Sequence, residues 1–261
     1  MKTQNYIILL LVTVILSSCN PAQSQSRRDH LPGREVLPGS ELMDVSFFEP
    51  FTSTGMIDEV KNGIRNPFRK IMKKMRWIDK EGKKLIEQVL TYRDPKNDKV
   101  TGIHKTYYDP ATLQVVYWDY YKNGSKGQFA FKAEGTKLSG TQSPGDENAK
   151  WRTVDVGLKL FQNESRELLF RALGNVPVGT EVKFPIIGMQ PPFHGWVSYK
   201  YAKDQEVSFN GKKVIAQLWQ ASNNAESYYQ VIKEEPYVIL RALPTGGTNA
   251  HVFSYQTVQK P

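Results

Sequence analysis

The chain has 261 residues, and its 35 basic and 26 acidic residues give it a formal net charge of +9 at pH 7. Its single cysteine, Cys19, excludes a disulfide within the chain and leaves no further thiol for a nucleophile or a zinc ligand. Stability must therefore come from the packed core alone. The excess of positive charge favours either an anionic partner or simple solubility.

Residues 1–18 have the pattern of an export signal. Lys2 supplies a basic start, an apolar stretch runs from Tyr6 to Leu16, and small residues lead up to Cys19. A membrane-spanning helix needs about 20 predominantly apolar residues, and this stretch is shorter. We therefore expect the segment to be cleaved on export rather than to remain as a membrane span.

The residues at the expected cleavage point, Leu16-Ser17-Ser18-Cys19, resemble the lipobox of bacterial lipoproteins. The resemblance implies that the Cys19 thiol carries diacylglycerol, which anchors the protein in a membrane. An ordinary secretory signal with a stray cysteine is the alternative. We expect an outer-membrane lipoprotein that faces the periplasm and acts as a monomer. In that compartment the counter-charge is lipid or glycan rather than nucleic acid.

A flexible tether is expected to follow the lipid anchor, over residues 19–45. Gln, Ser, Arg, Pro and Gly dominate its first part, which cannot bury enough apolar surface to offset the entropy of ordering. Residues 46–261 have a length that sheet-rich proteins often fold as a single domain. We therefore expect one β-rich domain after the tether.

From Phe68 onward, short runs rich in Val, Ile, Thr, Tyr, Phe and Trp alternate with turn residues, which is typical of β-strands. Phe68–Ile78 and Lys83–Arg93 flank a turn that ends in Gly82, and Asn210-Gly211 is a strong hairpin signal. The other predicted strands span residues 100–109, 114–122, 128–132, 136–141, 181–187, 195–201, 205–209, 212–221, 227–233, 237–243 and 250–258.

One amphipathic helix interrupts this series of strands, between Leu158 and Leu173. Its apolar residues recur at helical spacing, and Gly174-Asn175 followed by Pro177 supplies a stop signal. Roughly twelve strands with one good helix indicate a mainly β fold. We expect a curved antiparallel sheet or half-open, clam-like barrel with one central amphipathic helix.

Val207–Val214 and Tyr228–Leu240 contain a hairpin and then a Pro-aromatic step into the last strands. This arrangement resembles the late hairpins of exported bacterial β domains of unknown function, over about Phe68 to Val258. Those domains resemble the half-barrel, or clam, of the lipoprotein-localisation factors and related lipid carriers. The resemblance implies a curved sheet that holds an acyl ligand under helical cover, without catalysis, and it transfers no functional residue.

The chain shows no pattern of catalytic residues. His30, His104, His194 and His251 are too widely spaced for a local metal motif, so we expect no metal site. His194, beside aromatic residues at a predicted strand mouth, has a candidate role as a base or ligand donor, against an ordinary loop hydrogen bond. No serine has the Gly-x-Ser-x-Gly context of a nucleophile, and the glycines of residues 244–248 lack the lysine of a phosphate loop. We therefore expect neither an enzyme nor a cofactor.

Aromatic side chains are the clearest candidates for ligand contacts. Alternate residues of a strand face opposite sides, so Tyr117, Asp119 and Tyr121 share one face while Trp118 and Tyr120 share the other. Tyrosine and tryptophan suit a pocket for a lipid or a sugar, although they equally fill a large β core. The candidate ligand-binding residues are Trp118, Tyr120, Phe129, Phe131, Trp196, Tyr199, Trp219 and Tyr229.

The segment Val60 to Ile78 carries no acidic residue among its many bases. Such a segment contacts anionic headgroups favourably, at about 1 kcal/mol per charge. Pro67 argues against one continuous helix, so a short helix followed by a strand with a solvated basic face is the alternative. The basic residues are Lys61, Arg65, Arg69, Lys70, Lys73, Lys74 and Arg76.

Together these patterns predict a membrane-anchored periplasmic protein that binds a hydrophobic or amphipathic ligand without catalysis. The first alternative is a structural or adhesion module with a filled core and no pocket. The second is a carbohydrate-active enzyme, which needs two carboxylates about 5 to 10 Å apart across a cleft. The candidate aspartates fit turns or solvated strand faces, and they are Asp94, Asp98, Asp109 and Asp119.

Overall fold

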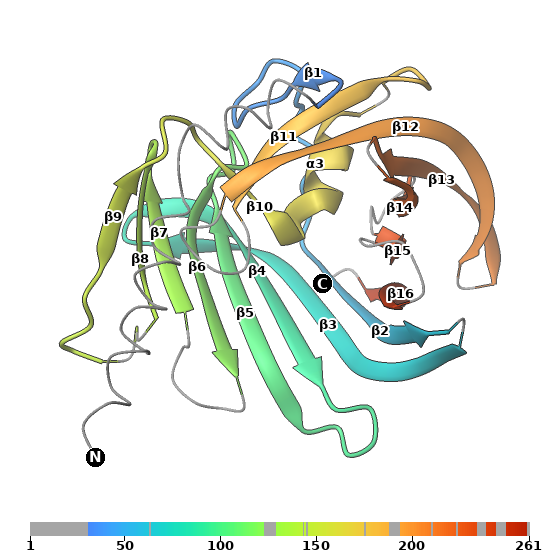
Figure 1. The fold of residues 1–261 in the computed structure, drawn as a ribbon, viewed down its shortest axis with the longest axis horizontal. Helices are drawn as coiled ribbons and strands as arrows, with labels where there is room; N and C mark the ends of the chain where they lie inside the picture. Colours follow the sequence, from blue (N-terminus) through green and yellow to red (C-terminus); the bar gives the residue numbers. More distant parts are fainter. Residues whose placement is uncertain are drawn as a thin grey trace, which may run out of the picture.

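The fold is one sheet of 16 strands that curves around a short helix, α3 (Figure 1). The structure is a computed structural model, and it describes residues 31–62, 64–122, 129–142, 144, 146–174, 176–187, 194–209, 211–222, 224–233, 239–243 and 249–259. Nearly all neighbouring strands are antiparallel, and the sheet has free ends at β9 and β1. The expected mainly β fold, a curved sheet that stays open, is confirmed.

The first half of the sheet is an antiparallel meander in which each strand pairs with the next. Between β3 and β4, Lys80 pairs with Lys83 across Glu81 and Gly82, whose φ angles of 53° and 73° fit a type I′ turn. The strands are β2 (Phe51–Lys61), β3 (Ile64–Lys80), β4 (Lys83–Arg93), β5 (Val100–Tyr108), β6 (Val115–Lys122), β7 (Phe129–Glu134), β8 (Lys137–Thr141) and β9 (Arg152–Asp155).

The second half is a further meander that returns to the first half. Phe209 pairs with Lys212, as the hairpin signal predicts, and the last strand pairs with β2 to join the two halves. The predicted strands 195–201 and 205–209 form one long strand with a register shift. The strands are β11 (Glu181–Ile187), β12 (His194–Phe209), β13 (Lys212–Ala221), β14 (Asn224–Ile232), β15 (Ile239–Leu243) and β16 (Asn249–Gln259).

The predicted helix is shorter than its sequence pattern indicates. α3 spans Arg166–Ala172, seven residues, and a 3-10 turn, η1 (Asn163–Ser165), precedes it. The two residues before that turn form β10 (Phe161–Gln162), which runs parallel to β11. The helical spacing from Leu158 is therefore misleading, because Phe161 belongs to a strand.

The tether predicted over residues 19–45 extends too far. β1 (Arg34–Glu35) pairs in parallel with β11, and Val36 is fully buried. Residues 34–45 therefore belong to the domain, because strand pairing and an apolar contact order them despite their polar composition.

The short helix suggested within the basic segment is also absent. β3 is extended from Ile64, and it pairs with β2, a strand that the sequence pattern did not reveal. Pro67 lies within β3, next to a shift in the β2–β3 register after Ile57. A bulge explains how a strand tolerates a proline, which cannot donate to the ladder.

The core lies on the concave side of the sheet, around α3. Leu168, Leu169 and Phe170 of the helix are at most 2% exposed and belong to the main apolar cluster. A second cluster, between β6, β7, β8 and the segment before β10, contains Trp118 and Phe131. The helix thus fills the curve of the sheet.

Candidate functional site

Three predicted ligand-binding aromatics lie around Phe170 of α3. The Phe170 ring stacks on Trp219 at a centroid distance of 4.8 Å and meets Tyr199 edge-on at 5.1 Å. Its distance to the Tyr229 ring is 5.6 Å. β12, β13 and β14 supply these partners. The helix α3 therefore occupies the position between these aromatic residues where the sequence pattern predicted a ligand.

The remaining predicted aromatics lie elsewhere. Trp118 and Phe131 are fully buried and stack at 5.5 Å in the second cluster. Tyr120 and Phe129 stack at 6.4 Å and pack against the same cluster. Trp196 is buried on β12. The structure therefore divides the predicted site rather than bringing it together.

A cavity of about 10 Å³ lies against the end of α3, which is room for about one water molecule. Its walls include Phe170, Gly174, Gln217 and Val231. A drug-sized ligand needs about 300 Å³ or more. This cavity is therefore too small to be a ligand pocket, and Phe170 packs beside it.

A buried ion pair and a histidine–carboxylate contact connect the start of α3 to β3 and β5. The Lys73 ammonium and the Glu167 carboxylate form an ion pair with side chains only 5% and 2% exposed. His104 Nδ1 lies 2.9 Å from Glu164 Oε2. We call these four residues the charge seam. Because each carboxylate there has a cationic or imidazole partner, the seam fixes η1 and α3 to the sheet.

Aromatic rings and a neutral hydrogen-bond chain surround the charge seam. The His104 ring lies 4.4 Å from Tyr120 and 5.1 Å from Tyr92. Tyr108 donates to Gln88 Oε1 at 2.8 Å, and Gln88 Nε2 donates to the Glu164 carbonyl at 3.4 Å. The seam is therefore enclosed, and its groups act on one another.

Arg166 lies on the opposite side of the same helical turn. Its guanidinium donates to the Tyr229 hydroxyl and to the Asn163 side-chain oxygen. The guanidinium carbon is 5.1 Å from the centre of the Tyr229 ring and 5.7 Å from that of Tyr199. We call Arg166, Asn163, Tyr199 and Tyr229 the arginine site.

The arginine site differs from the seam because its cation hydrogen-bonds only to neutral groups, although the Glu164 carboxylate also acts on it electrostatically. No ion pair joins Arg166 to a carboxylate in the described part of the chain, and its buried Nε has no hydrogen-bond partner there. Burial raises the pKa of Tyr199 and of Tyr229, so both phenols stay neutral. The site therefore has the chemistry to bind an anion.

Sequence reasoning missed the arginine site. Arg166 and Asn163 are three residues apart and so lie on one side of a helical turn, but only the fold brings them to Tyr199 and Tyr229. A predicted helix that began at Leu158 also obscured this position. The signal that could have been used is the polar run of residues 162–167, which contains Arg166 and interrupts the apolar residues on either side.

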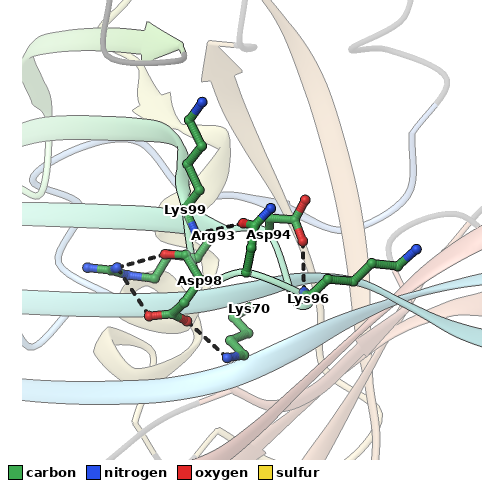
Figure 2. Close-up of polar contacts among 7 residues, drawn as sticks. Lys70, Arg93, Asp94, Lys96, Asp98 and Lys99 are labelled. Atoms are coloured by element: carbon green, nitrogen blue, oxygen red, sulfur yellow. Dashed lines mark hydrogen bonds and ion pairs between the residues drawn. The ribbon is translucent and has the colours of Figure 1, made fainter.

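An exposed charge cluster fastens the β4–β5 turn to β3 (Figure 2). Asp98 accepts from Lys70 Nζ at 2.9 Å and from Arg93 at 3.3 Å. The hydrogen bond from Lys70 lowers the pKa of Asp98. Asp94 accepts the Lys96 backbone N–H at 2.7 Å. Both aspartates therefore form a turn, as their sequence context predicts.

Asp119 lies on the other face of β6 from Trp118. Tyr121 donates to its Oδ2 at 3.0 Å, which confirms that these two residues share a face. The residue is 4% exposed, and its Oδ1 has no hydrogen-bond partner among the described residues. Burial is the largest cause that raises the pKa of this carboxyl.

Several predicted features lie outside the residues that the structure describes. Residues 1–18, Cys19, His30 and the 244–248 loop are outside the described residues, as are the side chains of His194 and His251. Within the described ranges, no group of three or more potential ligand residues is placed to hold a metal ion. None of the helices described there has the length and hydrophobicity to span a membrane.

Comparison with known proteins places the fold but not the function. No family model and no curated protein sequence matches the chain. A crystal structure described as a β-barrel-like protein of domain of unknown function DUF1849 from Brucella abortus matches with a TM-score of 0.53 and 9% identity. The match covers 82% of this chain and 98% of that one. At this identity it shows a shared barrel-like fold, and the expectation of a barrel-like domain of unknown function is confirmed to that extent.

Proposed function

We propose that this protein is a non-catalytic envelope lipoprotein that binds an amphipathic ligand with an anionic head group. The observation that carries the proposal is the arginine site, where a cation inside the curved sheet donates hydrogen bonds only to neutral groups of the described residues. Burial of a cation without a carboxylate in direct contact is costly, so a ligand carboxylate or phosphate would stabilise this arrangement.

The surroundings of Arg166 suit the apolar part of such a ligand. Phe170, Trp219 and Tyr229 are each at most 5% exposed and form an aromatic wall beside the guanidinium. β15 and β16 continue the sheet beyond β14. Because α3 packs tightly against the aromatic wall, an acyl chain binds there only if the helix moves.

The proposed anchor is Cys19, acylated after removal of residues 1–18, with the domain on the periplasmic side of the outer membrane. A lipobox-like sequence and an export signal support this location. Metabolic labelling with a fatty acid tests it, and a Cys19→Ser variant is the control. The absence of catalysis is part of the proposal, and the pairing of both carboxylates in the charge seam supports it.

A structural module without a ligand is the second candidate function. The observation that favours it is the dense interior, in which Trp118, Phe131, Phe170 and Trp219 are fully buried. Native mass spectrometry of the protein purified from its own host separates the two functions. A bound acyl compound supports the first, and a mass that matches the anchored chain alone supports the second.

A binding assay with defined probes tests the role of Arg166. We expect the full chain to bind dodecanoate at least about tenfold more tightly than dodecanol, since a charge-assisted hydrogen bond contributes about 1.5–3 kcal/mol. Arg166→Gln should remove this preference. Arg171→Gln, a substitution in the same helix, is the matched control and should retain it. Equal binding of both probes by the unmodified chain would contradict the proposal.

A further inference from the structure

We propose that the end of the β2–β3 hairpin docks on the surface of an anionic lipid bilayer. We call residues 61, 62 and 64–69 the hairpin tip. Figure 1 shows β2 and β3 running out together to one end of the molecule, at the right of the view, where the β12–β13 turn also lies. This contact is independent of the arginine site.

The hairpin tip exposes two apolar side chains to solvent. Ile64 is 65% exposed and Phe68 is 37% exposed. Ile57 pairs with Arg69 and Asp58 with Pro67, so Phe68 is the additional residue of the bulge. A bulge redirects side chains locally. The two apolar groups therefore lie on one short segment that is otherwise polar.

Arginines with no anionic partner accompany these apolar groups. Arg65 and Arg69 form no ion pair in the described part of the chain, and the Arg69 guanidinium lies 4.5 Å from the centre of the Phe68 ring. The neighbouring bases are already neutralised, since Lys61 pairs with Glu59 at 3.0 Å and Lys70 with Asp98 at 2.9 Å. Among the described residues, the charges of the tip without an acidic partner are thus Arg65 and Arg69, which are adjacent in sequence to Ile64 and Phe68.

This combination fits a bilayer better than a protein partner. Guanidinium groups bind lipid phosphates, and apolar side chains between them insert at the level of the headgroups. A stable protein interface buries about 800 Å² on each partner. A narrow hairpin end with two apolar side chains offers much less than that, whereas a bilayer needs only shallow insertion.

The test uses a fluorescent label at the tip of the full chain. Ile64→Cys is labelled with an environment-sensitive dye and mixed with vesicles of phosphatidylcholine, with or without phosphatidylglycerol. Val178→Cys is the matched control. Val178 is 58% exposed and lies in a turn, and no arginine is adjacent to it in the sequence. The unmodified chain, labelled in parallel, reports any free thiol at Cys19.

We expect a blue shift, and quenching by spin-labelled lipid, for the dye at position 64 with phosphatidylglycerol vesicles only. The dye at position 178 should stay in water. Adding Arg65→Gln, an exposed change, and Arg69→Gln, a half-buried one, should reduce the shift at position 64 to the level of the control, with an unchanged circular dichroism spectrum. A dye at position 64 that stays in water with both vesicles, or that responds equally to both, would overturn the proposal.

Discussion

The charge seam and the arginine site lie on opposite sides of one turn of chain, yet they treat charge differently. Glu164 and Glu167 point toward β5 and β3, where His104 and Lys73 bind them. Arg166 points toward β12 and β14, where it contacts Tyr199 and Tyr229, and it also donates to Asn163. Residues three apart share a side of the turn, so this short segment presents two distinct faces.

This difference indicates which side of the turn contributes to stability. A charge that has an opposite charge as its partner is neutralised in the folded chain. Its removal leaves the partner buried without a counter-charge. Removal of a charge that has neutral hydrogen-bond partners leaves no buried carboxylate unpaired, although those partners lose a hydrogen bond. When present, such a charge can still bind an external anion. Stability should therefore depend on the seam, and ligand binding on the arginine site.

Substitution in the charge seam should lower the free energy of unfolding the most. Lys73→Met leaves the Glu167 carboxylate, whose side chain is 2% exposed, without its ammonium partner. We expect the free energy of unfolding to fall by about 3–5 kcal/mol, measured by urea denaturation.

The double variant Lys73→Met/Glu167→Leu should recover most of that loss, because no charge is left unpaired. Lys70→Met is the exposed control, and loss of its pair with Asp98 should change stability by about 0–1 kcal/mol. If the single variant were as stable as this control, the seam would not fix the helix.

A smaller effect is expected at the arginine site. Arg166→Met removes hydrogen bonds to Tyr229 and Asn163 but leaves no carboxylate without its partner. We expect a loss of about 1 kcal/mol in urea denaturation, together with loss of the preference for dodecanoate. A loss as large as that of Lys73→Met would show that this arginine is structural and would remove the contrast between the two sides.

Asp119, a buried carboxyl outside both sites, should make the stability of the fold depend on pH. Burial raises the pKa of Asp119 above 3.8, so the folded chain binds this proton more tightly than the unfolded chain does. The stabilisation that the protonated carboxyl contributes is complete at low pH and is lost as the pH rises through the folded pKa. Asp119→Asn should therefore raise stability on the order of 1 kcal/mol at pH 7, and change it little below about pH 4. Urea denaturation at both values checks this, and an equal effect at both would contradict it.

Much of the fold could be predicted because local residues determine it. Gly82 and Gly211 mark hairpins whose pairings lie where the sequence places them. β2 escaped prediction because Thr, Ser and Gly dilute its apolar pattern, and the helix boundary was wrong because Phe161 pairs with β11. Those errors share a cause, since tertiary pairing decides both segments.

The candidate site was predictable only in part. Tyr199, Trp219 and Tyr229 stand out in the sequence because large aromatic residues are visible there, and they do gather at one place. Whether Arg166 has a carboxylate partner depends on residues more than 30 positions away, which no spacing reveals. Unpaired charge is a property of the assembled molecule.

The pairing of the last strand with the first long one has a consequence for biogenesis. β16 forms its ladder with β2, nearly the whole domain away along the chain, so the sheet is complete only when the C-terminus has arrived. Until then, a nascent polypeptide that emerges N-terminus first presents an uncovered strand edge, which invites aggregation. A truncation that ends at Leu243 should make that vulnerable intermediate permanent.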